Sequence, residues 1–146
     1  MDVREIIKAK GAAVETIHPE ATLRQAIRKL CEKRIGSLLV MGSNGDGGRP
    51  IGILTERDIL RQCDAGADLD RMPVGEAMVT KLIIGLLHDD VQRAMATMTE
   101  HHIRHLPVLD DRTGQVAGVL SIGDVVGALL EEDEAQVRYY HDYICR

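Results

Sequence analysis

Two short stretches of the chain carry the same pattern of residues that could bind a ligand. One reads I-G-I-L-T-E-R-D-I-L and the other, near the C-terminus, reads A-G-V-L-S-I-G-D-V-V. In each, an apolar run passes a glycine and ends at a hydroxyl residue, Thr55 or Ser121. An aspartate follows three residues later, Asp58 or Asp124, and an apolar, helix-like segment begins there. Whatever the first copy does, the second is built to do as well.

A hydroxyl residue followed three residues later by an acid, at the start of an apolar run, is also the signature of a helix capping box. In that interpretation the two motifs only satisfy the first backbone N–H groups of two helices. Ligand binding fits too, because a hydroxyl and free N–H groups at a helix N-terminus suit a phosphate. An ionised aspartate only accepts hydrogen bonds, which suits two adjacent ribose hydroxyls. The repetition favours ligand binding, with which capping can coexist.

Composition limits the classes of protein to which the chain can belong. Its 146 residues suffice for one compact unit, or for two small halves that share a core. There is no Trp and no Phe, so the core must be built from Leu, Ile, Val, Met and Ala. The net charge is −5, and no run of Lys or Arg alternates with aromatic residues. Because nucleic-acid binding depends on clustered cations, we expect no nucleic-acid partner.

No segment of the sequence indicates secretion or insertion into a membrane. Residues 1–10 are charged and lack the apolar stretch of a signal peptide. No apolar run approaches the roughly 20 residues that span a bilayer. The cysteines Cys31, Cys63 and Cys145 are odd in number and widely spaced, which is typical of free thiols in a reducing compartment. We therefore expect a cytoplasmic protein with no membrane partner.

Hydrophobic spacing and turn residues divide the chain into alternating helices and strands. Helices are predicted over residues 2–8, 23–34, 56–63, 74–78, 90–101 and 122–130. Strands are predicted over residues 12–17, 37–41, 50–54, 82–84, 106–109 and 115–120. A glycine-rich loop at 42–48 and a turn at 110–114 each join two strands, which are therefore predicted to be antiparallel neighbours.

The second half of the chain repeats the order of the first. Leu23 corresponds to Val91 and Leu30 to Met98 at one constant spacing, which shortens only across the glycine-rich loop. Each half reads β-α-β-β-α, and we predict an α+β fold in which the two repeats pack with pseudo-two-fold symmetry. The predicted boundaries are 1–66 for the first repeat, 67–130 for the second and 131–146 for a C-terminal helical tail. An apolar stripe on this tail would cover its own module or a dimer partner, and comprises Val137, Tyr140 and Ile144.

The repeated motifs resemble those of the CBS domain (cystathionine β-synthase domain). In the second copy the motifs M-x-T, I-R-H-L-P-V and G-V-L-S-x-x-D are carried by Met78, Thr80, residues 103–108 and residues 118–124. In the first copy residues 35–40 and 52–58 carry the resemblance, and G-I-L-T-E-R-D is the more typical ending. The resemblance covers residues 3–130, so the chain is similar to a stand-alone pair of CBS domains, known as a Bateman module.

The resemblance implies a non-catalytic regulatory module. Such pairs typically bind adenosine compounds in clefts between the repeats: AMP first among our expectations, then ADP, ATP, NAD(H) or S-adenosylmethionine. They usually form homodimers and signal energy or redox state to an effector protein, here unidentified. The alternative is a ligand-free dimerisation or interaction scaffold in which the aspartates only cap helices. An enzyme is disfavoured, because no nucleophile–base pair, paired carboxylates or P-loop stands out.

The resemblance also implies which residues line the clefts, since each cleft in the family combines elements of both repeats. The expected first cleft contains Thr55, Arg57, Asp58, Thr80, Ile103, Arg104, His105, Leu106 and Pro107. The expected second cleft contains Ile35, Gly36, Ser37, Leu38, Ser121 and Asp124. Arg104 and His105 correspond to Gly36 and Ser37 of the first repeat, and cations at these positions often reach ligand phosphates in the family. Unequal cation supply predicts two sites of different affinity, unless these cations are solvated or paired with acids.

Three histidines, His101, His102 and His105, raise the question of a metal site. Their spacing places them across a helix end and a strand instead of on one helical face, and no cysteine or acid cluster accompanies them. We therefore predict no metal and no catalytic cofactor.

Overall fold

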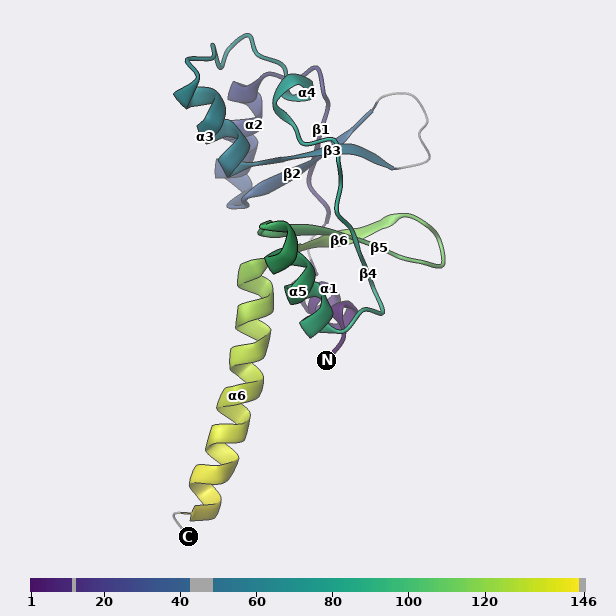
Figure 1. The fold of residues 1–146 in the computed structure, drawn as a ribbon, viewed down its shortest axis with the longest axis vertical. Coiled ribbons are helices and arrows are strands. Elements are labelled where there is room, and N and C mark those ends of the chain that lie inside the picture. The colour runs from purple at the N-terminus through teal and green to yellow at the C-terminus, as the bar shows by residue number, and fades with distance from the viewer. Residues whose placement is uncertain (12, 43–48, 145–146) are drawn as a thin grey trace.

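The computed structural model describes residues 1–11, 13–42 and 49–144 (Figure 1). Its helices are α1 (Val3–Lys10), α2 (Leu23–Lys33), α3 (Glu56–Asp64), α4 (Val74–Ala77), α5 (Val91–His101) and α6 (Ile122–Ile144). Its strands are β1 (Thr16–Ile17), β2 (Ser37–Met41), β3 (Pro50–Thr55), β4 (Gly85–Leu86), β5 (His105–Leu109) and β6 (Val116–Ser121). The loop predicted at 42–48 lies, after its first residue, outside the described residues.

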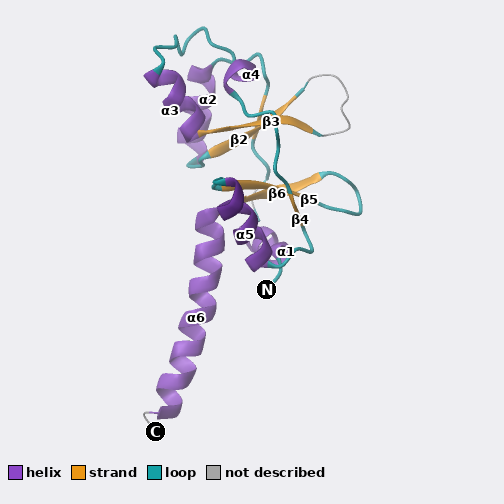
Figure 2. Ribbon diagram, in the orientation of Figure 1, coloured by secondary structure: helices purple, strands orange, loops and turns teal. Residues whose placement is uncertain are grey.

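The strands form two three-stranded sheets of the same topology, in the orders β1-β2-β3 and β4-β5-β6. The short leading strand of each sheet runs parallel to its neighbour, and the other two strands are antiparallel. The two sheets lie one above the other in the middle of the molecule, with helices on their outer sides (Figure 2). The predicted α+β class, built from two β-α-β-β-α repeats, is confirmed.

The leading strand of the second repeat lies later than predicted, because β4 is Gly85–Leu86 and not residues 82–84. In the first repeat Thr16 pairs with Leu39, whose N–H donates to the leading segment at 3.2 Å. The equivalent of Leu39 in β5 is Pro107, which has no N–H to donate. The pairing of the second repeat therefore begins one residue pair later than that of the first.

Two further elements differ from their predicted bounds. Of the strand predicted at 12–17, only Thr16–Ile17 pairs with β2. The helix predicted at 122–130 and the helical tail are one continuous helix, α6, which extends away from both sheets (Figure 1). Residues 131–135 of α6 are exposed. The side chains of the predicted apolar stripe, Val137, Tyr140 and Ile144, lie outside the described part of the structure.

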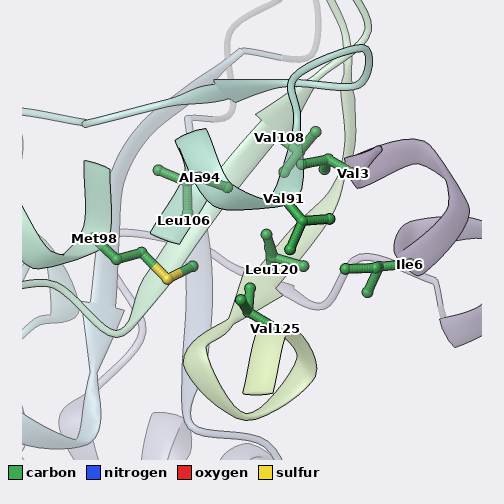
Figure 3. Packing of buried hydrophobic residues seen from close by; sticks show 9 residues of the cluster. All are labelled: Val3, Ile6, Val91, Ala94, Met98, Leu106, Val108, Leu120 and Val125. Carbon is green, nitrogen blue, oxygen red and sulfur yellow. The ribbon is translucent and has the colours of Figure 1, made fainter. Parts of the chain in front are cut away.

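Each sheet has its own aliphatic core, and each core is completed by a helix from the other half of the chain. Val3 and Ile6 of α1 are buried in the core of the second repeat, beside Val91 and Leu120 (Figure 3). Val74 of α4 is buried in the core of the first repeat, together with residues of α2, β2, β3 and α3. The two leading helices are thus exchanged between the repeats.

The segments that enter the space between the repeats follow helices that end in the same way. Arg34 after α2 and His102 after α5 both adopt the left-handed backbone conformation, each with φ of 54°. Such a cap redirects the chain at the end of a helix. Residues 35–37 and 103–105 therefore turn into β2 and β5 at equivalent places.

Candidate functional site

The first hydroxyl–aspartate pair lies where β3 leads directly into α3. The N–H of Thr55 donates to Oδ2 of Asp58 at 2.9 Å, and the hydroxyl of Thr55 donates to the same oxygen at 3.0 Å. Asp58 is 6% exposed, and its Oδ1 lies 3.8 Å from Nη1 of Arg61. The pair therefore caps α3, and Oδ1 accepts no hydrogen bond from any residue that the structure describes.

The second pair has the same place at the junction of β6 and α6, with one additional partner. The N–H of Ser121 donates to Oδ2 of Asp124 at 2.9 Å, and the N–H of Asp124 donates to Oγ of Ser121 at 3.0 Å. Lys10, the last residue of α1, donates from Nζ to Oδ2 of Asp124 and to the carbonyl oxygen of Val119, both at 2.9 Å. Partial burial opposes ionisation of Asp124, but the hydrogen bonds from Ser121 and Lys10 outweigh it and lower the pKa of the carboxyl.

The glycine of each motif allows a leading segment to approach the sheet closely. A Cβ at Gly118 would lie 2.9 Å from Cδ1 of Ile7, so this glycine admits α1 against β6. A Cβ at Gly52 would lie 2.6 Å from Sδ of Met78 and 2.9 Å from the carbonyl oxygen of Val79. Val79 also exchanges two backbone hydrogen bonds of 2.9 Å with Ile53 of β3. The two glycines therefore allow the close packing that places Lys10 beside the second cleft and Val79 beside the first.

The first cleft has a volume of about 380 Å³ and is lined by both repeats. Seven of the residues expected there line it: Thr55, Arg57, Asp58, Ile103, Arg104, His105 and Pro107. Ile53, Val79 and Ile83 add apolar surface. The structure therefore brings the hydroxyl–aspartate pair of the first repeat together with the I-R-H-L-P segment of the second.

The second cleft has a volume of about 520 Å³ and is also lined by both repeats. Five of the residues expected there line it: Ile35, Gly36, Ser37, Ser121 and Asp124. Lys10, Ala13, Val14 and Glu15, which precede β1, complete one wall. The second hydroxyl–aspartate pair thus meets the segment of the first repeat with which it was expected to combine.

Three of the expected residues do not line either cleft. Leu38 and Leu106, which are equivalent in the two repeats, are fully buried in the two hydrophobic cores. Thr80 is exposed between Val79 and Lys81, both of which line the first cleft. For these three residues a direct role in binding stays a prediction.

One wall is shared by the two clefts, because Glu56 and His105 line both of them. Gly36 lies against this wall: a Cβ there would be 2.9 Å from Cε1 of His105 and would clash with Oε1 of Glu56. Burial lowers the pKa of the His105 imidazole below its ordinary value of 6.5, although Glu56 acts in the opposite direction. The imidazole between the clefts is therefore neutral at pH 7.

Within the described residues, no group of three or more His, Cys, Asp and Glu side chains is placed to hold a metal ion. No described helix combines the length and the apolar character needed to cross a bilayer.

A sequence profile of the CBS domain matches the chain twice, over residues 3–64 and 74–131. The chain belongs to the CBS domain family. The mitochondrial CBS domain-containing protein CBSX3 of Arabidopsis thaliana is 32% identical to it, over 97% of this chain and 71% of the relative. A protein with CBS domains from Burkholderia ambifaria has a similar structure, with a TM-score of 0.81 and 36% identity over 90% of this chain and 95% of its own.

A CBS domain protein of Pyrobaculum aerophilum was solved in complex with AMP. It matches this chain with a TM-score of 0.75 and 31% identity, over 85% of this chain and 89% of its own. The tandem CBS pair predicted from the repeated motifs is confirmed. The fold that surrounds the two clefts is therefore one in which an adenosine nucleotide has been observed in another member of the family.

Several charged residues of this CBS pair line a cleft without having been expected there. Arg61 and Lys81 line the first cleft, and Lys10, Lys33 and Arg34 line the second. Arg61 could have been inferred, since it lies one helical turn after Asp58. Lys10 had no such signal, because it is 114 residues from Asp124 in the sequence and reaches it only through the packing of α1.

Proposed function

We propose that the chain is a non-catalytic regulatory module that binds an adenosine nucleotide in its clefts. The observation that carries the proposal is a hydroxyl, an aspartate and a helix N-terminus together in the wall of each cleft, formed at Thr55 and Asp58 and again at Ser121 and Asp124. Each cleft also takes residues from both repeats. A ligand that binds one arrangement of the repeats more tightly would shift the population toward that arrangement, which is the physical basis of regulation.

The residues of the first cleft supply complementary chemistry for each part of a nucleotide. Oδ1 of Asp58 is available to accept hydrogen bonds from ribose hydroxyls. The N-terminus of α3 and the guanidinium groups of Arg57 and Arg104 suit phosphate oxygens. Apolar side chains such as Ile53 and Val79 offer a surface on which an adenine ring can pack.

AMP is the ligand that we place first, ahead of ADP, ATP, NAD(H) and S-adenosylmethionine. The AMP complex of the Pyrobaculum aerophilum protein supports this choice, since that protein is 31% identical to this chain. Oδ2 of each aspartate already holds the backbone N–H of the preceding hydroxyl residue. Helix capping and ribose binding can therefore be divided between the two carboxylate oxygens of one aspartate.

We further propose a cytoplasmic homodimer that reports energy or redox state to an effector protein. Leu60 of α3 and Val126 of α6 are equivalent in the two repeats, and they are 70% and 43% exposed. Apolar side chains exposed at symmetry-related positions are suited to contact a second copy of the chain. Sedimentation of the wild type and of a Leu60→Glu, Val126→Glu variant tests this, and we expect the variant to be monomeric.

A second candidate function is a ligand-free scaffold, and one observation favours it. Both aspartates already have partners within the chain: Asp58 caps α3, and Asp124 caps α6 and holds Lys10 at 2.9 Å. A carboxylate whose hydrogen bonds are satisfied internally can be purely structural. The two functions therefore differ in whether anything binds beside these aspartates.

Thermal unfolding in the presence of AMP, ADP, ATP, NAD, NADH and S-adenosylmethionine separates the two functions. A ligand at about 100 times its dissociation constant stabilises the native state by about 2.7 kcal/mol, which is an easily measured shift. Asp58→Asn and Asp124→Asn keep an oxygen to cap each helix but lose the carboxylate, so we expect weaker binding. Asp64→Asn, on the exposed end of α3, is the matched control. A panel without any shift at millimolar ligand would favour the scaffold.

A further inference from the structure

We propose that the two clefts bind adenosine compounds of different charge. The first cleft takes a nucleoside di- or triphosphate, and the second takes a compound of low charge, such as a monophosphate or an uncharged nucleoside. Lys10 is the residue that sets the preference of the second cleft. The inference rests on the proposed function, and it goes further by assigning a ligand class to each cleft from the balance and pairing of the charged groups.

The first cleft has an excess of positive charge. Four arginine and lysine residues line it, Arg57, Arg61, Lys81 and Arg104, against the two carboxylates of Glu56 and Asp58. Phosphate groups are attracted by such a cluster, and each additional phosphate adds negative charge for these cations to neutralise.

Most of these cations are also free to bind a ligand. Arg57, Lys81 and Arg104 form no ion pair with any residue in the described part of the chain. Arg61 has one partner, Asp58, at 3.8 Å, and 68% of its side chain is exposed. A polyphosphate entering the first cleft therefore gains new charge-assisted contacts without first breaking existing ones.

The charges of the second cleft balance, and most of them are already paired. Its cations Lys10, Lys33 and Arg34 face the carboxylates of Glu15, Glu56 and Asp124. Lys10 contacts Asp124 at 2.9 Å and Lys33 lies 3.8 Å from Glu15. A polyphosphate would have to separate these pairs and approach the freed carboxylates. A weakly charged ligand avoids both costs.

The volumes of the two clefts do not explain the proposed difference in ligand preference. The second cleft is the larger, at about 520 Å³ against about 380 Å³ for the first. If volume decided, the larger ligand would favour the second cleft. The opposite assignment follows from charge, so the two explanations predict opposite results.

The full-length chain, labelled with ¹⁵N, is titrated separately with ATP, AMP and adenosine while the amide signals of the two clefts are followed by NMR. Thr55, Arg57 and Lys81 report on the first cleft, and Ser37, Gly118 and Ser121 on the second. We expect the first cleft to bind ATP at least tenfold more tightly than AMP, and the second to bind ATP no more tightly than AMP. The preference of the first cleft should weaken between about 0.01 and 0.15 M ionic strength, as the Debye length falls from about 30 to 8 Å.

A double variant, Lys81→Gln with Arg104→Gln, should lose most of the ATP preference of the first cleft and leave the second unchanged. The matched control is Lys8→Gln with Arg93→Gln, which removes the same charge from exposed positions outside both clefts. If the ratio of the ATP affinity to the AMP affinity is the same in the two clefts, or if the second cleft prefers ATP, the inference is overturned while nucleotide binding stands. If no adenosine compound shifts either set of amides, the proposed function fails as well.

Discussion

The two repeats share a backbone and differ in the side chains that face the clefts. Both have the same strand order, and both antiparallel ladders shift register at equivalent places, after Val40 and after Val108. Helices α2 and α5 are followed by residues in the left-handed conformation with the same φ, Arg34 and His102. Backbone hydrogen bonds and the spacing of aliphatic residues determine these features, so the two repeats share them although many of their other side chains differ.

Positions that line a cleft in one repeat show the opposite behaviour, because their equivalents differ in charge and size. Gly36 corresponds to Arg104, Glu56 to Ile122, and Arg57 to Gly123. The strand pairing around these positions is nonetheless the same in both repeats. Arg57 and Arg104 line the first cleft, whereas Ile122 packs against the core of the second repeat. A duplicated framework can therefore hold two clefts of different charge.

The largest effect that we predict tests the shared framework. Leu38→Ala and Leu106→Ala remove equivalent, fully buried side chains, and each should lower the free energy of unfolding by about 2–5 kcal/mol. Urea unfolding followed by circular dichroism measures both, and the two costs should be similar. Arg93→Ala, at an exposed position of α5, is the control and should change stability by about 0.5 kcal/mol or less. A large cost in one repeat alone would contradict the equivalence of the cores.

A smaller effect should distinguish the two caps. Asp58→Ala and Asp124→Ala each remove an acceptor at a helix N-terminus, which costs about 1 kcal/mol. Asp58 should cost more, because it is the more buried and accepts from both the N–H and the hydroxyl of Thr55. Urea unfolding of these variants beside Asp58→Asn and Asp124→Asn is the measurement, and asparagine should restore most of the loss. Equal stability of the alanine and asparagine variants would show that these caps contribute nothing.

Lys10→Gln should increase the difference in charge between the two clefts and have little effect on the free energy of unfolding. The ion pair with Asp124 is partly exposed, and such pairs contribute about 0–1 kcal/mol. Removing Lys10 frees Asp124 and makes the second cleft negative, so adenosine should bind there more tightly and ATP more weakly. The NMR titration described above reads both clefts in one experiment. A matching change in the first cleft would mean that Lys10 acts on the whole molecule and not on one cleft.

The smallest effect concerns pH and compares His105 with its equivalent, Ser37. The pKa of His105 is lowered in the folded protein, so below its ordinary pKa of 6.5 the unfolded chain binds more protons than the folded one. The stability contributed by the neutral imidazole is therefore present above pH 6.5 and is lost as the pH falls through the folded pKa. Glu56 and Asp124 moderate this shift, whereas Lys10 and Arg104 reinforce it.

His105→Ser gives the second repeat the side chain of the first and removes this titration. Urea midpoints measured from about pH 7.5 to 5 should fall more for the wild type than for the variant. Asp124 also titrates with loss of stability in acid, but its lowered pKa places that loss below this range. Parallel pH profiles for the two proteins would show that burial of His105 has no energetic consequence.

The sequence predicted the structure correctly wherever the local pattern of residues agrees with what the packing of the whole fold requires. The spacing of Leu23 and Val91, and the recurrence of Gly52 and Gly118, predicted the repeat, the fold class and the family. Leu23 and Val91 are apolar because each is buried in the core of its own repeat. The two glycines make room for segments of the other half of the chain, and only their recurrence in the sequence makes them visible. The expectation that each hydroxyl–aspartate pair meets a segment of the other repeat came from the family resemblance, and its role in binding is still to be tested.

Two features depended on distant contacts that no local pattern reveals. The start of β4 depends on the missing N–H of Pro107 in a neighbouring strand. The position of Lys10 depends on α1 crossing to the second repeat, which Gly118 permits. The helix predicted at the N-terminus was assigned by its own apolar face, and nothing in that face says which of two cores it will join.

The exchange of α1 and α4 makes the two repeats interdependent during folding. A cut in the connector between α3 and α4 would give two fragments, and each would carry the helix that completes the core of the other. Neither fragment could close its own core, but a mixture of the two contains every piece needed to rebuild both. The sequence is a duplication, but the two repeats fold as one unit. A substitution that unfolds one repeat should therefore destabilise the other, because each repeat supplies a helix to the core of its neighbour.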